Sequence, residues 1–375
     1  MASTGHGEEK KREDGKRKRE EEEESGAGLD KIQKRRRGLE DEETSSPYPK
    51  LPISRFTIHQ GLGRGNFGKV VLASVPGRNI YMAIKIIKKK EDNNEVIVRE
   101  RRILHASRDC PFICHLYAAH ESLERAYIIT EYLSGGSLEG LIRMCGYLNI
   151  GNVRFYTAEM VSALQFLHRK NIVHRDLKPE NIMLDADGHI RIIDLGLAED
   201  GVTASRNIDG MAGTFHYMAP EVLLRRGYGA AVDWWSLGIV LSRMATGRHP
   251  FYNGPVMQQA FKAMTTENPK FPSWIDADGK HLIKKLLRKN PEERLGVCGN
   301  IRQHPFFNTI GWKELEERRV TPPWKPMETG LQSQHLQWPE DTDTLHPRDD
   351  FNYMSPSWTR WMRRSRLCRN PRPSG

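Results

Sequence analysis

The chain changes its hydrophobic period once, and this change limits the folds that it can adopt. From Phe56 to about Phe307, apolar residues recur regularly, first in short strand-like runs and then in long helical patterns. The expected strands cover residues 55–63, 68–75, 81–88 and 126–133, one charged helix covers 95–107, and long helices cover 152–170 and 233–247. Strands followed by helices predict an α+β fold with a small sheet-rich lobe and a larger helical lobe.

The first 54 residues differ in composition from the rest of the chain. They hold blocks of like charge and almost no large apolar side chains, so we expect a disordered charged tail over residues 1–54. Two basic blocks, KRKR at 16–19 and KRRR at 34–37, predict either recognition by a nuclear import factor or binding to a polyanion. The alternative is a solvated tail whose adjacent acidic run cancels most of this charge. We expect a cytoplasmic or nuclear location, or both.

The five cysteines are scattered and form no CxxC motif, which favours a reducing compartment over a disulfide framework. The densest group of metal-ligand types is Cys110, Cys114, His115 and His120. Its spacing fits no standard zinc pattern, so we interpret this stretch as a buried strand. No apolar run is long enough to cross a membrane, and the N-terminal region lacks the apolar segment of a secretory signal. These features predict a soluble intracellular protein.

Residues 171–196 read NIVHRDLKPENIMLDADGHIRIIDLG and concentrate charged and amide side chains in a turn-rich segment. The DADG at 185–188 predicts a hairpin between short strands at 181–185 and 189–194. A hairpin explains the turn residues. It does not explain why HRDLKPEN precedes the first strand or why an aspartate follows the second.

A second cluster of chemical interest lies upstream, in GLGRGNFGKV. The glycines Gly63, Gly65 and Gly68 are followed by a strand and not by a helix, so the loop is predicted to be a hairpin tip whose bare backbone approaches phosphates. Lys85 follows on the next strand between apolar neighbours, which favours an inward-facing cation. Glu100, on the charged helix, is positioned to hold it.

Together these segments resemble the motif set of the protein kinases, which catalyse phosphoryl transfer. The motifs occur in family order: the glycine loop, Lys85, Glu100, HRDLKPEN, DLG at 194–196 and APE at 219–221. The resemblance implies a two-lobed protein kinase fold that uses ATP and Mg²⁺. It assigns catalysis to Asp176, Lys178, Lys85 and Glu100, and metal binding to Asn181 and Asp194. The lysine in DLKPEN is typical of serine/threonine kinases.

The resemblance also implies a nucleotide site between the lobes, with adenine against the backbone of residues 131–133. Its expected members are Leu62, Gly63, Arg64, Gly65, Asn66, Phe67, Gly68, Lys69, Val70, Ala83, Lys85, Thr130, Glu131 and Leu133. Asp233 and an ion pair between Arg294 and Glu221 are expected to form scaffold in the large lobe.

Within the kinases, the chain is most similar to the AGC group and to the calcium-independent protein kinase C enzymes. The similar segments include GRGNFGKVVLA, CPFICHLY, VDWWSLGIVL and TIGWKELEERRVTPPWKP, and they extend to about Pro326. We expect a kinase domain over 56–307, an AGC-type C-terminal extension over 308–375, protein substrates and a monomeric state. The short, cysteine-free N-terminal region predicts no lipid-regulatory domain.

Several residues depart from the family pattern. Leu195 replaces phenylalanine and keeps an apolar anchor, whereas Gly210 stands where the family has a phosphorylated threonine. We expect Asp209 to supply a fixed charge for Arg175 instead, or phosphorylation to use a different hydroxyl, that of Thr203 or Ser205. In the tail, FNYMSPSW at 351–358 only loosely resembles the hydrophobic motif that docks on the small lobe.

The positions that usually select basic substrates also differ. They correspond to Ser137, Glu180 and Arg243, so one acidic residue remains. Arg243 is expected either to repel basic peptides or to point to solvent, and Glu139 to compensate in part.

These features support three functional hypotheses, ranked in this order: an active serine/threonine kinase, a pseudokinase or scaffold with an altered activation segment, and a nucleic-acid-binding protein. The basic blocks lack the interleaved aromatic residues that stack on bases.

Overall fold

The computed structural model describes residues 53–65, 68–251, 254, 256–326 and 351–364. The basic blocks at 16–19 and 34–37, Asn66, Phe67 and Cys368 lie outside these residues, so the predictions that rest on them stay predictions. Ile53 is already fully buried, and the structured part of the chain therefore begins earlier than the tail boundary expected at residue 54.

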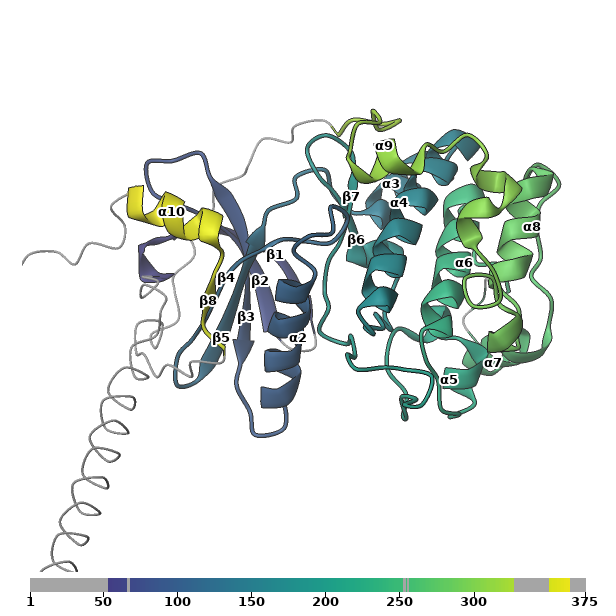
Figure 1. Cartoon of the computed structure of the whole chain (residues 1–375), viewed down its shortest axis with the longest axis horizontal. Helices are drawn as coiled ribbons and strands as arrows, with labels where there is room; N and C mark the ends of the chain where they lie inside the picture. The colour runs from purple at the N-terminus through teal and green to yellow at the C-terminus, as the bar shows by residue number, and fades with distance from the viewer. Residues whose placement is uncertain (1–52, 66–67, 252–253, 255, 327–350, 365–375) are drawn as a thin grey trace, which may run out of the picture. The chain divides into compact units, whose positions relative to one another are not determined.

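The small lobe is a six-stranded antiparallel sheet in the order β1-β2-β3-β5-β4-β8 (Figure 1). Its strands are β1 Thr57–Gly65, β2 Gly68–Ser74, β3 Tyr81–Lys88, β4 Leu116–Glu121, β5 Arg125–Glu131 and β8 Tyr353–Met354. Helix α2, Asn94–Ala106, packs beside this sheet and turns Ile97, Glu100, Ile103 and Leu104 inward. The expected strands and charged helix are confirmed to within a few residues.

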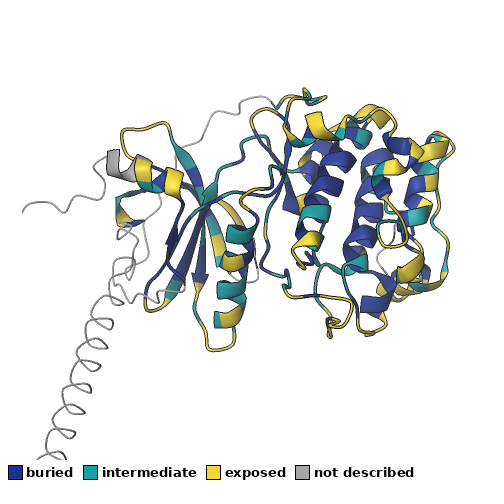
Figure 2. Ribbon diagram, viewed as in Figure 1, coloured by how far each residue is buried: buried dark blue, intermediate teal, exposed yellow. Residues whose placement is uncertain are grey.

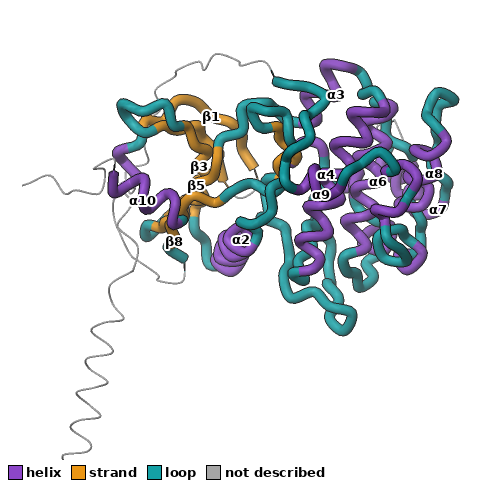
Figure 3. The backbone as a smooth tube through the Cα atoms, turned by 45° about the horizontal axis from the view of Figure 1, so that its top comes forward, coloured by secondary structure: helices purple, strands orange, loops and turns teal. Residues whose placement is uncertain are grey.

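The large lobe is mainly helical, and Figure 3 shows the helices gathered apart from the strands of the sheet. Its helices are α3 Leu138–Cys145, α4 Ile150–Arg169, α5 Pro220–Leu223, α6 Ala231–Thr246, α7 Met257–Thr266, α8 Ala277–Leu286 and α9 Trp312–Glu316. Short 3-10 helices among the described residues cover Ile53–Arg55, which precedes β1, and Pro179–Asn181, Phe215–Tyr217, Pro291–Glu293, Ile301–Gln303 and Pro305–Phe307 in the large lobe. Helices α4 and α6 are buried on most of their surface, as Figure 2 shows, so they form the core of this lobe.

Side-chain caps explain where several of these helices begin. The side chains of Ser137, Asn149 and Asp276 accept hydrogen bonds from backbone amides at the starts of α3, α4 and α8. Gly247 ends α6 in the left-handed conformation. The predicted hairpin is also present, with β6 Ile182–Leu184 pairing with β7 Ile190–Ile192.

Residues 110–120, predicted as a buried strand, form a strand only from Leu116, where β4 begins. Residues 110–115 precede β4 and run beside the hairpin, where the Cys114 amide donates to the Ile192 carbonyl at 2.9 Å. Cys110 and Cys114 are buried, and burial raises the pKa of their thiols to about 11 and about 12. No group of histidine, cysteine or acidic residues in the described part of the chain is arranged to hold a metal ion. Core packing is therefore confirmed as the role of these two cysteines.

The described C-terminal residues pack on both lobes. Residues 322–326 contact the large lobe near Gly188 and Gly135, and β8 adds to the edge of the small-lobe sheet beside β4. Phe351 is fully buried, and β8 pairs with β4. The segment that loosely resembles the docking motif therefore lies on the small lobe. A further helix that we did not predict, α10 Pro356–Arg364, follows, and Trp358 stacks on Tyr117 at 4.8 Å between ring centroids. None of the described helices is long and apolar enough to cross a membrane.

Candidate active site

Lys85 is held between two carboxylates that come from different parts of the fold. It lies on β3 between the buried residues Ile84 and Ile86, and its Nζ contacts Glu100 Oε1 at 2.6 Å and Asp194 Oδ1 at 2.8 Å. Glu100 is almost fully buried on α2, whereas the side chain of Asp194 is 45% exposed. The predicted pair of Lys85 and Glu100 is confirmed, and Asp194 joins it.

The charges of this cluster stabilise one another. Burial alone would lower the pKa of Lys85, but the two carboxylates together outweigh burial and raise it above its ordinary value. Burial would likewise raise the pKa of Asp194. The Lys85 ammonium and the backbone N–H of Gly196 overcome that effect and hold the pKa of Asp194 below its usual range. Lys85 is therefore cationic and Asp194 anionic at neutral pH.

Asp176 lies at the centre of a second hydrogen-bonded group. Its Oδ2 accepts from Lys178 Nζ at 2.8 Å and from Asn181 Nδ2 at 3.0 Å, and its Oδ1 accepts from Thr214 Oγ1 at 2.7 Å. Lys178 Nζ also contacts Thr214 Oγ1 at 2.6 Å. The carboxylate of Asp176 is thus fixed in orientation by three side chains, of which sequence reasoning missed Thr214.

Asn181 and Asp194 offer the oxygen atoms expected of a magnesium site. Asn181 Nδ2 donates both to the Asp176 backbone carbonyl, at 2.9 Å, and to its carboxylate, so the amide oxygen is turned the other way. Amide and carboxylate oxygens are the ligands that Mg²⁺ prefers, and it usually binds through one or two protein groups together with phosphates. The residues present therefore fit this ion.

The segment before Asp176 is held by a buried acid, as expected of Asp233. Its carboxylate accepts from the backbone N–H groups of His174 and Arg175, each at 2.9 Å, and contacts His168 Nε2 at 2.8 Å. Arg175 and Asp194 both have a positive φ, of 67° and 48°, which is strained for residues with a side chain. The predicted pair of Arg294 and Glu221 is also confirmed.

The glycine loop lies where the sequence predicts, at the β1–β2 hairpin. Gly63 pairs with Val70, Gly65 pairs with Gly68, and Val70 lies opposite Lys85. A Cβ on Gly63 would meet nothing within 4 Å, whereas one on Gly68 would lie 2.1 Å from the Ile86 carbonyl oxygen. Gly63 fits a bare phosphate-facing backbone. Gly68 is required by its close approach to β3.

The other predicted nucleotide-site residues lie along the same strands and the segment that follows them. Ala83 on β3 is paired with Thr130 on β5, and Glu131 ends that strand. Leu133 is buried just beyond it, whereas Leu62 on β1 is 38% exposed. Arg64 and Lys69 face each other across the hairpin. The described members therefore follow the strands from the hairpin tip, where Gly68 pairs with Ile87, to the end of β5, where Glu131 pairs with Met82, and Lys85 lies between these two levels of β3.

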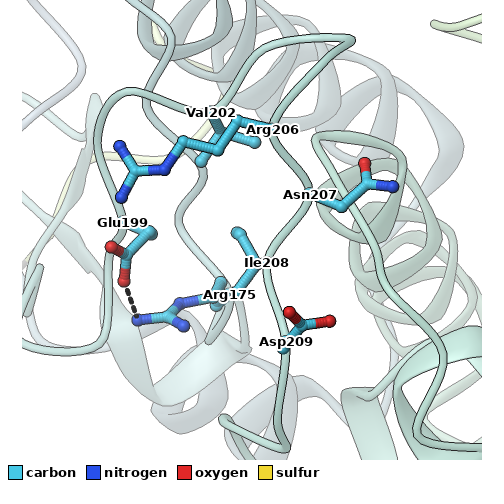
Figure 4. A pocket seen from close by; sticks show the side chains of 7 residues that line it. All are labelled: Arg175, Glu199, Val202, Arg206, Asn207, Ile208 and Asp209. Carbon is cyan, nitrogen blue, oxygen red and sulfur yellow. Dashed lines mark hydrogen bonds and ion pairs between the residues drawn. The ribbon is translucent and has the colours of Figure 1, made fainter.

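Arg175 does not form an ion pair with Asp209, and that expectation is wrong. The Arg175 Nη2 contacts Glu199 Oε2 at 3.0 Å, although Asp209 lines the same pocket of about 190 Å³ (Figure 4). Glu199 is nearer in the chain and is fixed by a β-bridge between its backbone and that of Val173. The adjacent acidic residues 199 and 200 were a sequence signal for a partner of Arg175, and we missed it.

Arg243 does not point freely to solvent. Its Nη2 contacts Glu139 Oε2 at 2.7 Å, and Arg143 contacts the other oxygen of the same carboxylate at 3.0 Å. Glu139 is therefore already paired with two arginines, which contradicts the idea that it compensates for lost acidic residues. Ser137, which stands at one of the positions where the family has an acidic residue, is the N-cap of α3.

A stability prediction follows from two glycines with positive φ. A Cβ on Gly213 would lie 2.4 Å from the Arg175 carbonyl oxygen, whereas one on Gly210 would meet nothing within 4 Å. Both Gly213→Ala and Gly210→Ala incur backbone strain of roughly 1–3 kcal/mol, and only the first adds a collision with the backbone. Urea unfolding should show the larger loss for Gly213→Ala. Equal losses would contradict the close approach.

Comparisons with known proteins agree with this geometry. The family model for the protein kinase domain matches residues 56–307. Protein kinase C delta type of Mus musculus is 40% identical over 281 residues, covering 74% of this chain and 42% of the relative. Protein kinase C-like 1 of Caenorhabditis elegans is 39% identical over 292 residues, which cover 75% and 41%. RAC-beta serine/threonine-protein kinase A of Xenopus laevis is 37% identical over 323 residues, which cover 84% and 64%. The chain thus spans about two-fifths of the protein kinase C relatives.

Proposed function

The chain belongs to the protein kinase family, and from that premise we propose that it transfers the γ-phosphoryl group of ATP to serine and threonine hydroxyls of proteins. The observation that carries the proposal is the fixed carboxylate of Asp176, held by Lys178, Asn181 and Thr214 within hydrogen-bond distance. Beside it, Lys85, Glu100 and Asp194 form the charged cluster that such a nucleotide requires.

The two groups have different roles in the reaction. The substrate hydroxyl oxygen attacks the γ-phosphorus, the bond from that phosphorus to the β,γ-bridging oxygen breaks, and Asp176 orients the hydroxyl and accepts its proton. Lys178, next to Asp176, neutralises charge on the transferring group. Lys85 binds phosphate oxygens of ATP and is oriented by Glu100. Asn181 and Asp194 would hold Mg²⁺, which would supply positive charge for the phosphates.

The alternative of a pseudokinase rested on the altered activation segment. The paired geometry of Lys85, Asp176, Asn181 and Asp194 favours catalysis instead, because each of these side chains is held as phosphoryl transfer requires. Leu195 is also buried, so it keeps the apolar anchor next to Asp194.

The proposal is tested with purified protein, MgATP and a peptide library that contains serine, threonine and tyrosine. We expect phosphopeptides with wild-type protein and a loss of roughly 10²-fold or more for Asp176→Asn, because the hydroxyl loses its proton acceptor. Phosphorylation confined to tyrosine, or equal activity of the two proteins, would refute the proposal.

Substrate selection gives a further prediction. Glu180 is exposed beside Asp176, whereas the carboxylate of Glu139 is paired with Arg243 and Arg143. We expect weaker selection for arginine at the near upstream position than in protein kinase C relatives, with some basic preference further upstream from Glu180. An oriented peptide library measures this profile.

Two variants separate these contributions. Arg243→Glu places a second carboxylate beside Glu139 and should shift the profile toward arginine by roughly 10-fold, the equivalent of about 1.4 kcal/mol. Glu180→Gln should flatten the remaining preference. A wild-type profile as basic as that of the relatives would overturn this account of the groove.

A further inference from the structure

Helix α2 is joined to the segment after Asp194 by three ion pairs, the longest of which joins Arg99 Nε to Asp200 Oδ1 at 4.0 Å. Arg99 Nη1 contacts Glu199 Oε2 at 2.8 Å, and Arg102 contacts Asp200 through two hydrogen bonds of 2.7 and 2.9 Å. Arg99 is the immediate neighbour of Glu100, the residue that orients Lys85. A force that positions Arg99 therefore also positions Glu100.

Glu199 also reaches the residue that precedes Asp176. The same oxygen, Oε2, contacts Arg175 Nη2 at 3.0 Å, so one carboxylate bridges a guanidinium from α2 and a guanidinium from the large lobe. Its backbone is fixed as well, because the backbone amides of Glu199 and Val173 each donate to the other's carbonyl at 2.9 Å. The bridging carboxylate thus projects from a rigid position.

The burial of these groups decides which contact matters more. The side chains of Arg175, Glu199 and Arg99 are 11%, 16% and 25% exposed, whereas that of Arg102 is 57% exposed. Solvent screens the outer pair with Asp200 much more than the inner bridge. Without the Glu199 charge, Arg175 would lose the carboxylate that it contacts, and Arg99 would retain its longer contact with Asp200, at 4.0 Å.

The activation segment offers no hydroxyl at the position where relatives are expected to carry a phosphate. Gly210 has a φ of 89° and nothing within 4 Å of an added Cβ. Arg175 points to Glu199 across the pocket that Asp209 and Arg206 also line (Figure 4). A phosphate placed on Arg175 would meet the carboxylate of Glu199 and be repelled by it.

We propose that Glu199, supported by Asp200, is a positioning residue that replaces an activating phosphate: it holds α2 and Arg175 in the arrangement that places Glu100 on Lys85. This inference rests on the proposed kinase function and adds how the site is kept ready. The unphosphorylated chain is therefore already competent for transfer. Glu199 acts through Arg99 and Arg175 and does not touch the reacting atoms.

The test uses the full chain, expressed in bacteria, treated with phosphatase and shown by intact mass to carry no phosphate. We expect Glu199→Gln, which keeps the shape and removes the charge, to lower kcat by roughly 10- to 100-fold, the range for lost charge-assisted hydrogen bonds. The KM for peptide should change little, because Glu199 is paired with Arg99 and Arg175 and not with Glu180, the residue to which we assign basic preference. Glu199→Asp should recover part of the activity.

Asp209→Asn is the matched control, since it removes an acid from the same pocket and is expected to leave kcat unchanged. Hydrogen exchange without ATP supplies a readout that is independent of activity. Glu199→Gln should accelerate exchange in residues 94–106 of α2, and Asp209→Asn should not. If the double variant with Arg99→Gln and Glu199→Gln loses no more kcat than Glu199→Gln alone, the two residues act as a unit.

The possible failures are distinguishable. If unphosphorylated wild-type protein transfers no phosphoryl group until Thr203 or Ser205 is phosphorylated, the kinase function stands and the Glu199 proposal is wrong. The same conclusion follows if Glu199→Gln keeps wild-type kcat, or if Asp209→Asn causes the loss instead. If no form of the protein phosphorylates peptide, both the proposed function and this inference fail.

Discussion

Lys85→Met and Asp194→Ala are each expected to lower kcat by roughly 10²- to 10³-fold or more, because each removes a charge that the nucleotide and its metal require. Lys85 is bound by two carboxylates, and the half-exposed Asp194 contacts it at 2.8 Å. Transfer of labelled phosphate to peptide measures the loss. Circular dichroism should show that the fold is retained.

Lys88→Met provides the control for the first variant. Lys88 lies on the same strand, β3, but is exposed. The same substitution there should leave kcat within about 2-fold, since exposed charges distant from the site contribute little. If Lys85→Met kept activity within 10-fold of the wild type, or if Lys88→Met were as damaging, the assignment of the site would be wrong.

Glu221→Ala is expected to destabilise the large lobe by about 3–5 kcal/mol, because it leaves a buried guanidinium without its carboxylate. Arg294 is fully buried, and its Nη1 and Nη2 contact the two oxygens of Glu221 at 2.7 and 3.0 Å. The remaining contacts, to the carbonyls of Ala231 and Arg288, do not neutralise the charge. Urea unfolding measures the change in free energy.

An exposed ion pair in the same lobe supplies the comparison. Glu267 contacts Lys270 at 3.9 Å, and the side chain of Lys270 is 80% exposed. Glu267→Ala should therefore change stability by less than about 1 kcal/mol. A similar small change for Glu221→Ala would mean that Arg294 is stabilised by other contacts.

The sequence predicts much of the fold because its strongest signals are local. Alternating apolar residues placed β2, β3 and β5, and the turn residues at 185–188 placed the β6–β7 hairpin. The roles of Lys85, Asp176 and Asp194 came from the order of motifs shared with a known family. The structure adds the distances that join them.

Partners chosen by three-dimensional proximity were harder to predict. Glu199 and Asp209 both line the pocket next to Arg175. The backbone bridge between Val173 and Glu199 places Glu199 within ion-pair distance of Arg175. Thr214 lies 38 residues from Asp176 in the chain, and a threonine that follows Gly210 and Gly213 carries no distinct signal. Such contacts depend on the packing of segments whose spacing the sequence does not encode locally.

Short edge elements and glycines were also ambiguous. Strand β8 has two residues and forms by pairing with β4, so no alternation exists to be recognised. Gly68 fits a phosphate-binding loop by motif, yet the structure shows that the Ile86 carbonyl excludes any side chain there. The glycine at position 68 thus matches the motif, but close packing against β3 is what requires it.

The destination of the γ-phosphoryl group tests the central claim most directly. Wild-type protein, used without phosphatase treatment, is mixed with γ-labelled ATP, Mg²⁺ and a serine/threonine peptide, and ADP, free phosphate and phosphopeptide are measured together. The account predicts one labelled serine or threonine for each ADP formed, and loss of both products in Asp176→Asn. Label that stays in ATP, or that appears only as free phosphate, would contradict it.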